Sequence, residues 1–219
     1  MSEESAGSDT TASDVVATYD EIAAHFATKR KNPWPEVTSF LDGVESTTAL
    51  DVGCANGRHT ELLAAVADRA IGLDASRALL SEAESRRDDH NFDAILLQGD
   101  ASRLPLREDS VDLATYVATM HHLPTREARV ESLDELARVL TPAGRALVSV
   151  WSTEHDRFDE TQGFDTTVTF TMPDGRAVPR YYHIYDPSEF GTDLEASAVG
   201  VEREWVSNGN CYAVVTGSE

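Results

Sequence analysis

The stretch Thr48-Ala-Leu-Asp-Val-Gly-Cys-Ala-Asn-Gly-Arg-His59 decides how the chain is organised. Residues 49–52 form a short apolar run typical of a buried strand, and residues 60–66 are typical of the start of a helix. Gly53 and Gly57 allow the backbone between them to turn sharply and to approach a bound molecule closely. The first turn of the helix then presents unpaired N–H groups to that molecule. The stretch therefore predicts a strand, turn and helix unit beside a ligand.

Three details separate the two ligand classes that use such a unit, dinucleotides and S-adenosylmethionine (AdoMet). Residues 53–57 read Gly-x-Ala-x-Gly, whereas a dinucleotide turn has the spacing G-x-G-x-x-G. Asp51 lies within the strand, where a carboxylate repels a pyrophosphate but suits a cofactor with an ammonium and a sulfonium. Asp74 ends the next predicted strand and can accept hydrogen bonds from both hydroxyls of a ribose. These details favour AdoMet over a plain structural corner in which Asp51 is a buried hydrogen-bond acceptor.

The length and composition predict one domain with at most one insertion. The 219 residues suffice for a sizeable core, and no apolar run approaches the roughly 18 residues of a membrane helix. Residues 1–13 have neither the basic nor the apolar part of a signal peptide, so we expect a disordered acidic tail before a domain at 14–219. Cys54 and Cys211 have no metal-ligand spacing, so the sequence predicts no metal site and a cytoplasmic location.

The charge of the chain is strongly negative. The formal net charge is −21, and among 18 basic residues only Lys29 and Lys31 are lysines. Such a surface suggests a protein from a halophilic archaeon, whose cytoplasm screens the repulsion; the alternative is an acidic protein that avoids nucleic acid. A broad phosphate-binding face is disfavoured. RNA stays open as a substrate if its contacts are local or if a partner supplies positive charge.

Strands and helices alternate through most of the chain. The pattern predicts helices at 13–29, 60–66, 76–87, 125–140 and 187–198, a further helix beginning at Pro33-Trp-Pro35, and strands at 49–52, 70–74, 93–98, 111–118 and 146–151. Such alternation implies a parallel sheet with helices on both faces, whose ligands bind beyond the carboxyl ends of the strands. Asp51, Asp74, Asp100, His121 and His122 all follow or end such strands, which indicates a single site.

The final third of the chain has a different pattern. Residues 166–172 and 177–185 alternate like strands around the turn Pro173-Asp-Gly175, which predicts a hairpin insertion at about 152–187. Residues 201–206 and 211–216 flank an Asn-Gly turn, which is a strong signal for an antiparallel hairpin.

Taken in order, these segments resemble a class I AdoMet-dependent methyltransferase from residue 17 to residue 215. The resemblance implies an α/β, Rossmann-like fold with a mostly parallel seven-stranded sheet, helices on both faces and a C-terminal antiparallel hairpin. It also implies that AdoMet is bound by Asp51, Gly53, Cys54, Ala55, Asn56, Gly57, Asp74, Ala75, Asp100, Ala101 and Val117.

A narrower resemblance depends on five motifs in order. They are Tyr19-Asp-Glu-Ile-Ala-Ala-His-Phe26, Arg30-x-x-Pro-Trp-Pro35, His121-His122, Arg126-x-x-Arg129-Val130 and Arg180-Tyr-Tyr-His183. This order is similar to that of the eukaryotic wobble-uridine tRNA methyltransferases, which esterify 5-carboxymethyluridine. The resemblance implies a tRNA substrate and an obligate heterodimer with a small zinc-ribbon activator, which adds a strand to the sheet edge at 93–98. That segment is apolar, and an apolar edge strand requires a cover.

Methylating a carboxylate requires little acid–base help, because the nucleophile is already ionised at neutral pH. It requires a cation to hold the carboxylate, for which we select Arg30 and Arg180 as catalytic residues together with His121. Aromatic or polar side chains that contact the base would be Trp34, His122, Tyr181 and Tyr182. The histidines and tyrosines have an alternative role in packing. Two other functions also stay open: a small-molecule (quinone or metabolite) methyltransferase, and a non-catalytic subunit that keeps the fold.

Overall fold

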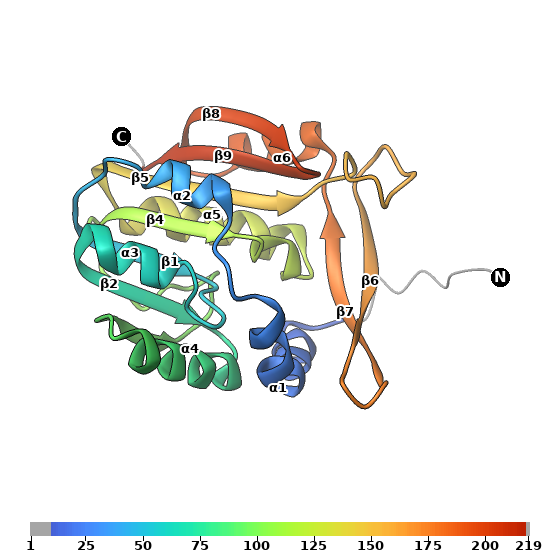
Figure 1. Ribbon diagram of the computed structural model, residues 1–219. Coiled ribbons are helices and arrows are strands. Elements are labelled where there is room, and N and C mark those ends of the chain that lie inside the picture. Colours follow the sequence, from blue (N-terminus) through green and yellow to red (C-terminus); the bar gives the residue numbers. More distant parts are fainter. Residues whose placement is uncertain (1–9, 218–219) are drawn as a thin grey trace.

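The computed structural model describes residues 10–217 and contains a seven-stranded sheet of order β3-β2-β1-β4-β5-β9-β8 (Figure 1). The strands are β1 (Ser46–Val52), β2 (Ala67–Asp74), β3 (Ile95–Gln98), β4 (Val111–Val117), β5 (Leu140–Trp151), β8 (Gly200–Ser207) and β9 (Asn210–Thr216). β1 to β5 are parallel to one another, while β9 is antiparallel to β5 and β8 is antiparallel to β9. The predicted Rossmann-like class is confirmed.

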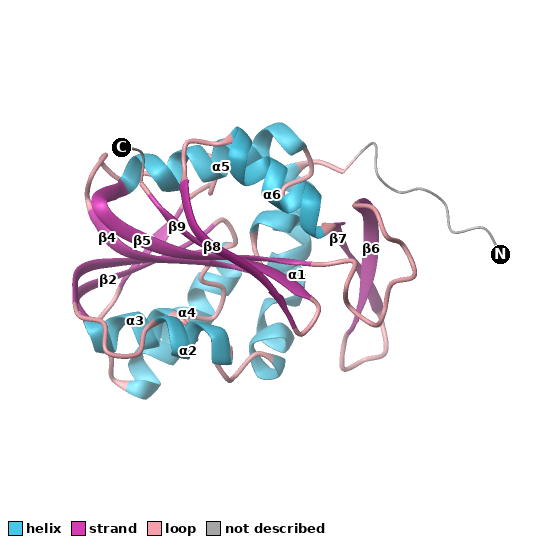
Figure 2. Ribbon diagram, turned by 90° about the horizontal axis from the view of Figure 1, so that it is seen from above, coloured by secondary structure: helices cyan, strands magenta, loops and turns pink. Residues whose placement is uncertain are grey.

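Helices cover both faces of this sheet, as Figure 2 shows. They are α1 (Ala12–Lys29), α2 (Pro35–Phe40), α3 (Thr60–Val66), α4 (Arg77–His90), α5 (Arg126–Val139) and α6 (Pro187–Ala196), with a 3-10 turn η1 (Met120–His122) after β4. α5 and α6 lie on one face, and α2, α3 and α4 lie on the other. Each face has its own apolar core, built around Leu133 and Phe190 on the first and around Val37 and Leu63 on the second. Among residues 10–217, no helix is long and apolar enough to cross a membrane.

Several predicted boundaries are wrong by a few residues. The N-cap of α1 is Thr11 and not Ser13, because Thr11 forms a reciprocal capping box with Asp14. Residues 12 and 13 therefore belong to a helix, and the rest of the predicted tail at 1–9 lies outside the described residues. α4 continues to His90 and ends where Asn91 takes a left-handed conformation. β5 begins at Leu140 rather than Ala146, because Leu140 already pairs with Val111 ahead of a bulge.

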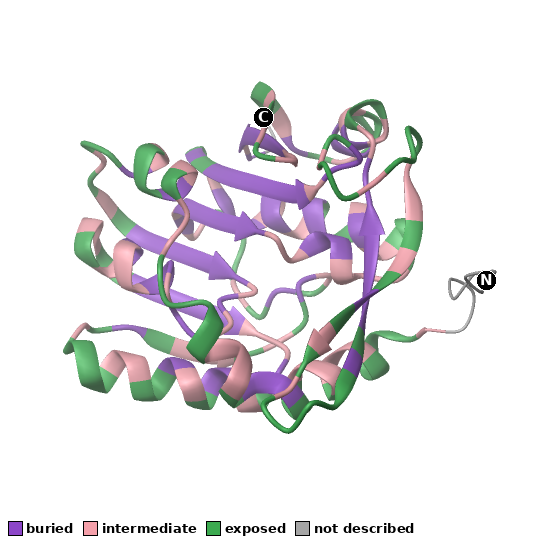
Figure 3. Ribbon diagram, turned by 45° about the vertical axis from the view of Figure 1, so that its right-hand side comes forward, coloured by how far each residue is buried: buried purple, intermediate pink, exposed green. Residues whose placement is uncertain are grey.

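The predicted hairpin forms a small sheet of its own. β6 (Phe164–Thr171) and β7 (Ala177–Ile184) pair only with each other as strands, and a single bridge from Ser152 to Tyr185 links this region to the end of β5. Figure 3 shows that β7 is largely buried along its length while β6 is largely exposed. α1 packs between α4 and β7. The hairpin and α1 therefore close the carboxyl end of the main sheet.

Candidate active site

A cavity of about 470 Å³ lies at the carboxyl ends of β1, β2 and β4, under α1 and β7. Most of the predicted site residues line it: Arg30, Trp34, Gly53, Cys54, Ala55, Asp74, Ala75, Asp100, Ala101, Val117, His121, His122, Arg180 and Tyr182. Asp51, Asn56, Gly57 and Tyr181 do not line it. The loops after β1 and β2 line one part of the cavity and η1 and β7 line another, while α1 contacts both parts.

The loop after β1 has a backbone shape that position 53 can adopt only as glycine. Gly53 has a φ of +71°, and a Cβ there would lie 2.2 Å from the Thr119 side chain. Its N–H and that of Cys54 both donate to the Leu73 carbonyl oxygen, at 2.7 and 2.9 Å. Ala55 also takes a positive φ of +48°, a conformation that is strained for a residue with a side chain. These hydrogen bonds and dihedral angles fix the path of the loop beside the cavity.

Asp74, the last residue of β2, fixes the loop after β1 through its carboxylate. Its Oδ2 accepts from the N–H of Ala55 at 2.8 Å, and its Oδ1 accepts from the N–H of Ser76 at 2.9 Å. Burial raises the pKa of Asp74 to about 6. Each oxygen retains a lone pair toward the cavity, so the carboxylate can accept from two neighbouring hydroxyls of a ligand. Asp100 also lines the cavity, and its Oδ1 accepts from the N–H and the hydroxyl of Ser102, both at 2.9 Å.

Asp51 and Asn56 connect the loop to the rest of the fold and do not face the cavity. The two oxygens of Asp51 accept from the hydroxyls of Thr115 at 2.8 Å and Thr60 at 2.7 Å, and burial raises its pKa. This is the arrangement of the structural alternative, a buried hydrogen-bond acceptor. Asn56 Nδ2 donates to the carbonyl oxygen of Arg30 at 3.0 Å, which ties the loop to the end of α1.

The two histidines of η1 are fixed in defined tautomers by their partners. His122 Nδ1 faces the Tyr181 carbonyl oxygen at 2.9 Å, so this nitrogen donates and Nε2 accepts from the Tyr19 hydroxyl at 2.8 Å. His121 Nδ1 accepts from the N–H of Trp151 at 2.9 Å, which places its proton on Nε2. Burial lowers the pKa of His122 to about 3 and that of His121 well below its usual value. Both rings are therefore neutral at neutral pH.

Arg180 is a buried cation with no anion beside it. Only 6 % of the residue is exposed, no carboxylate in the described part of the chain forms an ion pair with its guanidinium, and its buried Nε has no hydrogen-bond partner. The guanidinium carbon lies 5.2 Å from the ring centres of Phe170 and Tyr182. Since burying an unpaired charge is costly, this group is arranged to meet an anion that enters the cavity.

Three further arginines, Arg30, Arg58 and Arg157, line the same cavity, and none forms an ion pair within residues 10–217. Burial, with Arg30 nearby, lowers the pKa of Arg58 to about 10. In a chain of net charge −21, four unpaired arginines around one cavity form a local positive region. Sequence analysis selected Arg30 and Arg180 from this region but not Arg58 or Arg157.

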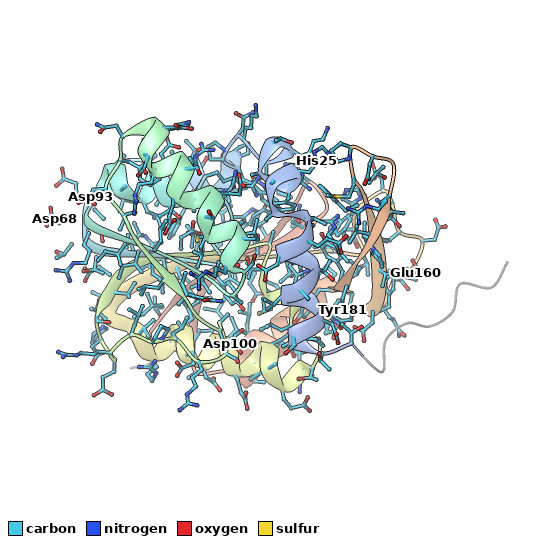
Figure 4. All side chains as sticks on the ribbon, turned by 90° about the horizontal axis from the view of Figure 1, so that it is seen from below. His25, Asp68, Asp93, Asp100, Glu160 and Tyr181 are labelled. Carbon is cyan, nitrogen blue, oxygen red and sulfur yellow. The ribbon has the colours of Figure 1, made fainter. Side chains whose placement is uncertain are left out.

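Tyr181 points away from the cavity. Its hydroxyl donates to Asp165 Oδ1 at 2.8 Å on the neighbouring strand β6, whereas Tyr182, one residue on, packs beside His122 with ring centres 4.4 Å apart. Alternation along β7 explains the difference. The stick view in Figure 4 shows Tyr181 near α1 and the hairpin, and Asp68 and Asp93 at the opposite end of the molecule.

Sequence reasoning also missed several lining residues, among them Tyr19, Arg58, His59, Trp151, Arg157, Asn208 and Asn210. Tyr19 lies on the apolar face of α1, and only its hydroxyl separates it from the packing residues of that face. Arg58 and His59 interrupt the glycine loop, which is a usable signal. The Trp34 N–H donates to His59 Nε2 at 3.3 Å, and burial lowers the pKa of His59 to about 3.

Known proteins are similar to this chain in sequence and in fold. The family described as methyltransferase domain matches residues 50–148. A protein of Encephalitozoon cuniculi named as a methyltransferase is 31% identical over 175 residues, which cover 76% of this chain and 78% of that protein. The mouse "tRNA (carboxymethyluridine(34)-5-O)-methyltransferase ALKBH8" is 38% identical over 139 residues, which cover 63% of this chain. The match spans only 20% of the mouse protein's length.

A solved structure agrees with the fold. A chain from a complex between the Haloferax volcanii Trm112 methyltransferase activator and a methyltransferase matches with a TM-score of 0.68 and 18% identity, over 92% of this chain and 98% of that chain. The chain belongs to the class I AdoMet-dependent methyltransferases, and its cofactor is AdoMet.

Proposed function

We propose that the protein methylates a carboxylate on a modified uridine of tRNA, forming a methyl ester. The observation that carries this proposal is Arg180, a buried guanidinium at the cavity wall without an anionic partner in the described chain. A guanidinium binds a carboxylate through two parallel hydrogen bonds, which fixes its orientation as well as its position.

The loops after β1 and β2 hold the cofactor in this proposal. Residues 53–55, Asp74 and residues 99–101 would hold AdoMet, with the Asp74 carboxylate as acceptor for the ribose hydroxyls and residues 99–101 beside the adenine. This end of the cavity fits AdoMet because it presents a carboxylate with free lone pairs and the glycine that the turn requires. When bound, AdoMet supplies a methyl group on a positively charged sulfur.

The other end of the cavity holds and orients the substrate. Arg180 and Arg30 bind the carboxylate, and the protonated Nε2 of His121 is a further donor to the ligand. Tyr182 and Trp34 offer ring faces to the base. α1 and β7 exclude water from the carboxylate oxygen, which increases its reactivity toward the methyl group.

The relatives support the choice of tRNA, since the mouse protein is named for carboxymethyluridine at position 34 of tRNA. The solved structure with the Trm112 activator supports a partner. In our proposal a small zinc-binding activator covers β3, an edge strand of the sheet on which Ile95 is 47% exposed. The acidic composition supports a high-salt cytoplasm as the working environment.

The test is methyl transfer from labelled AdoMet to tRNA that contains 5-carboxymethyluridine, measured with and without the activator. A methyl ester releases its label as methanol in mild base, and a methyl group on a base nitrogen or carbon does not. We expect base-labile label on the modified tRNA and none on the same tRNA with plain uridine. Stable label, or transfer only to a small metabolite, would overturn the proposal.

A further inference from the structure

A row of three aromatic rings in contact, one pair edge to face and the other stacked, has an arginine at each end and starts at the cavity. The Arg58 guanidinium lies 5.8 Å from the Trp34 ring, and Trp34 lies 6.4 Å from Tyr212. Tyr212 stacks on Trp205 at 5.2 Å with an interplanar angle of 11°, and the Arg203 guanidinium lies 4.6 Å from the Trp205 ring. We call these five residues the stacking row.

The stacking row leads out of the site along one face of the sheet. Arg58 and Trp34 line the cavity, and so do Asn208 and Asn210 from the turn between β8 and β9. Trp205 and Tyr212 are opposite each other on those two strands, next to this turn. The row therefore runs from the cavity mouth to β8, the outer strand at the top of Figure 1.

The members of the row differ in exposure in a way that leaves a usable surface. Tyr212, in the middle of the row, is buried, while Trp34, Arg58 and Trp205 are half-buried and Arg203 is exposed. Packing explains the Tyr212 ring. It does not explain two arginines that lie on indole rings and have no carboxylate partner among residues 10–217.

Nearby carboxylates are occupied or face elsewhere. Glu36 Oε1 accepts from the Ser207 hydroxyl and the Asn208 amide, both at 3.1 Å. Glu202 pairs with Arg145, and Glu204 points toward Gly191 in α6 on the opposite face of the sheet. Glu36 keeps its negative charge near Tyr212, but Arg58 and Arg203 form no ion pair within residues 10–217, so both guanidinium groups can still contact an anionic ligand.

We propose that the stacking row binds the unpaired nucleotides next to the methylated one in a single-stranded RNA loop. Indole faces stack on bases of any sequence, and arginines contribute both stacking and phosphate contacts. The surface continues directly from the cavity, so one strand can place a nucleotide in the site and its neighbours on the row. This inference rests on the proposed function in that RNA is the substrate.

The experiment compares two substrates that differ only in the neighbouring nucleotides. One is a stem-loop RNA with 5-carboxymethyluridine in its loop, and the other is the free 5-carboxymethyluridine nucleoside, which reaches the cavity alone. The variants are Arg203→Glu and Arg203→Ala at an exposed position, and Trp205→Leu with Trp205→Phe as its conservative partner. Arg69→Ala is the matched control, since Arg69 is exposed and unpaired within the described chain, and its neighbour Asp68 lies at the far end of the molecule (Figure 4).

We expect Arg203→Glu and Trp205→Leu to raise KM for the stem-loop about tenfold, with a much smaller effect on the nucleoside. Arg203→Ala lowers the salt dependence of stem-loop binding by about one ion, and Trp205→Phe and Arg69→Ala behave as the wild type. Thermal melting separates misfolding of Trp205→Leu from loss of binding.

The inference is overturned if Arg203→Glu and folded Trp205→Leu keep the wild-type KM for the stem-loop, or if both substrates are affected equally. A wild-type enzyme that methylates neither the nucleoside nor the stem-loop, when it is assayed together with the activator, refutes the proposed function itself, because the cavity alone suffices for the nucleoside.

Discussion

The two ends of the cavity satisfy their polar groups in different ways. At the cofactor end, Asp51 and Asp74 each use both carboxylate oxygens within the chain, and the N–H groups of Gly53 and Cys54 are both paired. At the substrate end, the buried guanidinium of Arg180 has no carboxylate partner among the described residues, and its Nε has no hydrogen-bond partner. Under the proposed function, the first end is preorganised before the cofactor binds, and the second is completed by the substrate.

The difference between the two ends affects the stability of the fold. Partnered buried groups stabilise the fold, whereas an unpaired buried charge reduces stability and is retained where function requires it. We therefore expect a substitution at the substrate end to reduce activity with little loss of stability, and a substitution at the cofactor end to reduce the stability of the fold.

The sharpest test is Arg180→Met, which keeps the packing on Phe170 and Tyr182 but removes the charge. We expect kcat/KM for the carboxylate substrate to fall about 100- to 1,000-fold, because two charge-assisted hydrogen bonds are lost. The midpoint of urea denaturation should stay the same or rise, and calorimetry should give an unchanged AdoMet affinity. A clear loss of stability would show that Arg180 is a structural residue.

At the cofactor end, Gly53→Ala should destabilise the protein by about 2–4 kcal/mol, since the new methyl meets Thr119 at 2.2 Å on a backbone with φ of +71°. Gly43→Ala is the matched control. Its φ is +68°, but no atom lies within 4 Å of the position that an added Cβ would take. The expected loss of unfolding free energy is therefore only the cost of the backbone conformation, about 1 kcal/mol. Equal losses of unfolding free energy in the two variants would contradict the close contact.

The smallest effect concerns pH. The pKa of Asp74 is about 6 in the folded chain, so the carboxylate gains a proton as pH falls through 6 and loses acceptor capacity for the ribose. We expect AdoMet affinity to be constant above this pH and to weaken below it by at most about tenfold per pH unit. Asp74→Asn should bind more weakly at neutral pH and show no such slope. A slope that survives in Asp74→Asn would assign it to another group.

The difference between the two ends also explains which residues of the candidate site could be predicted from the sequence. The cofactor end is built from a local pattern, so Gly53 and Asp74 could be identified from a glycine turn and from an acid at the end of a strand. Even there, the pairing of Asp51 with Thr60 and Thr115 needed the structure, because Thr115 comes from a distant strand.

The substrate end is assembled from segments far apart in the chain, and its members could be predicted only where a motif marked them. Arg180 was found through such a motif. Arg157 and Asn208 were not, because tertiary packing alone brings them to the cavity. Periodicity placed Tyr181 and Tyr182 on one strand, but only the structure showed that Tyr182 is the one that faces the cavity.

The separate pairing of β6 and β7 has an evolutionary consequence. Since their ladder bonds stay within the hairpin, a change in its length or sequence leaves the register of the seven-stranded sheet intact. Arg180 and Tyr182 are carried on this exchangeable part, while the cofactor loops belong to the fixed part. Under the proposed function, a lineage can therefore acquire a new substrate by remodelling one hairpin while its AdoMet site stays unchanged.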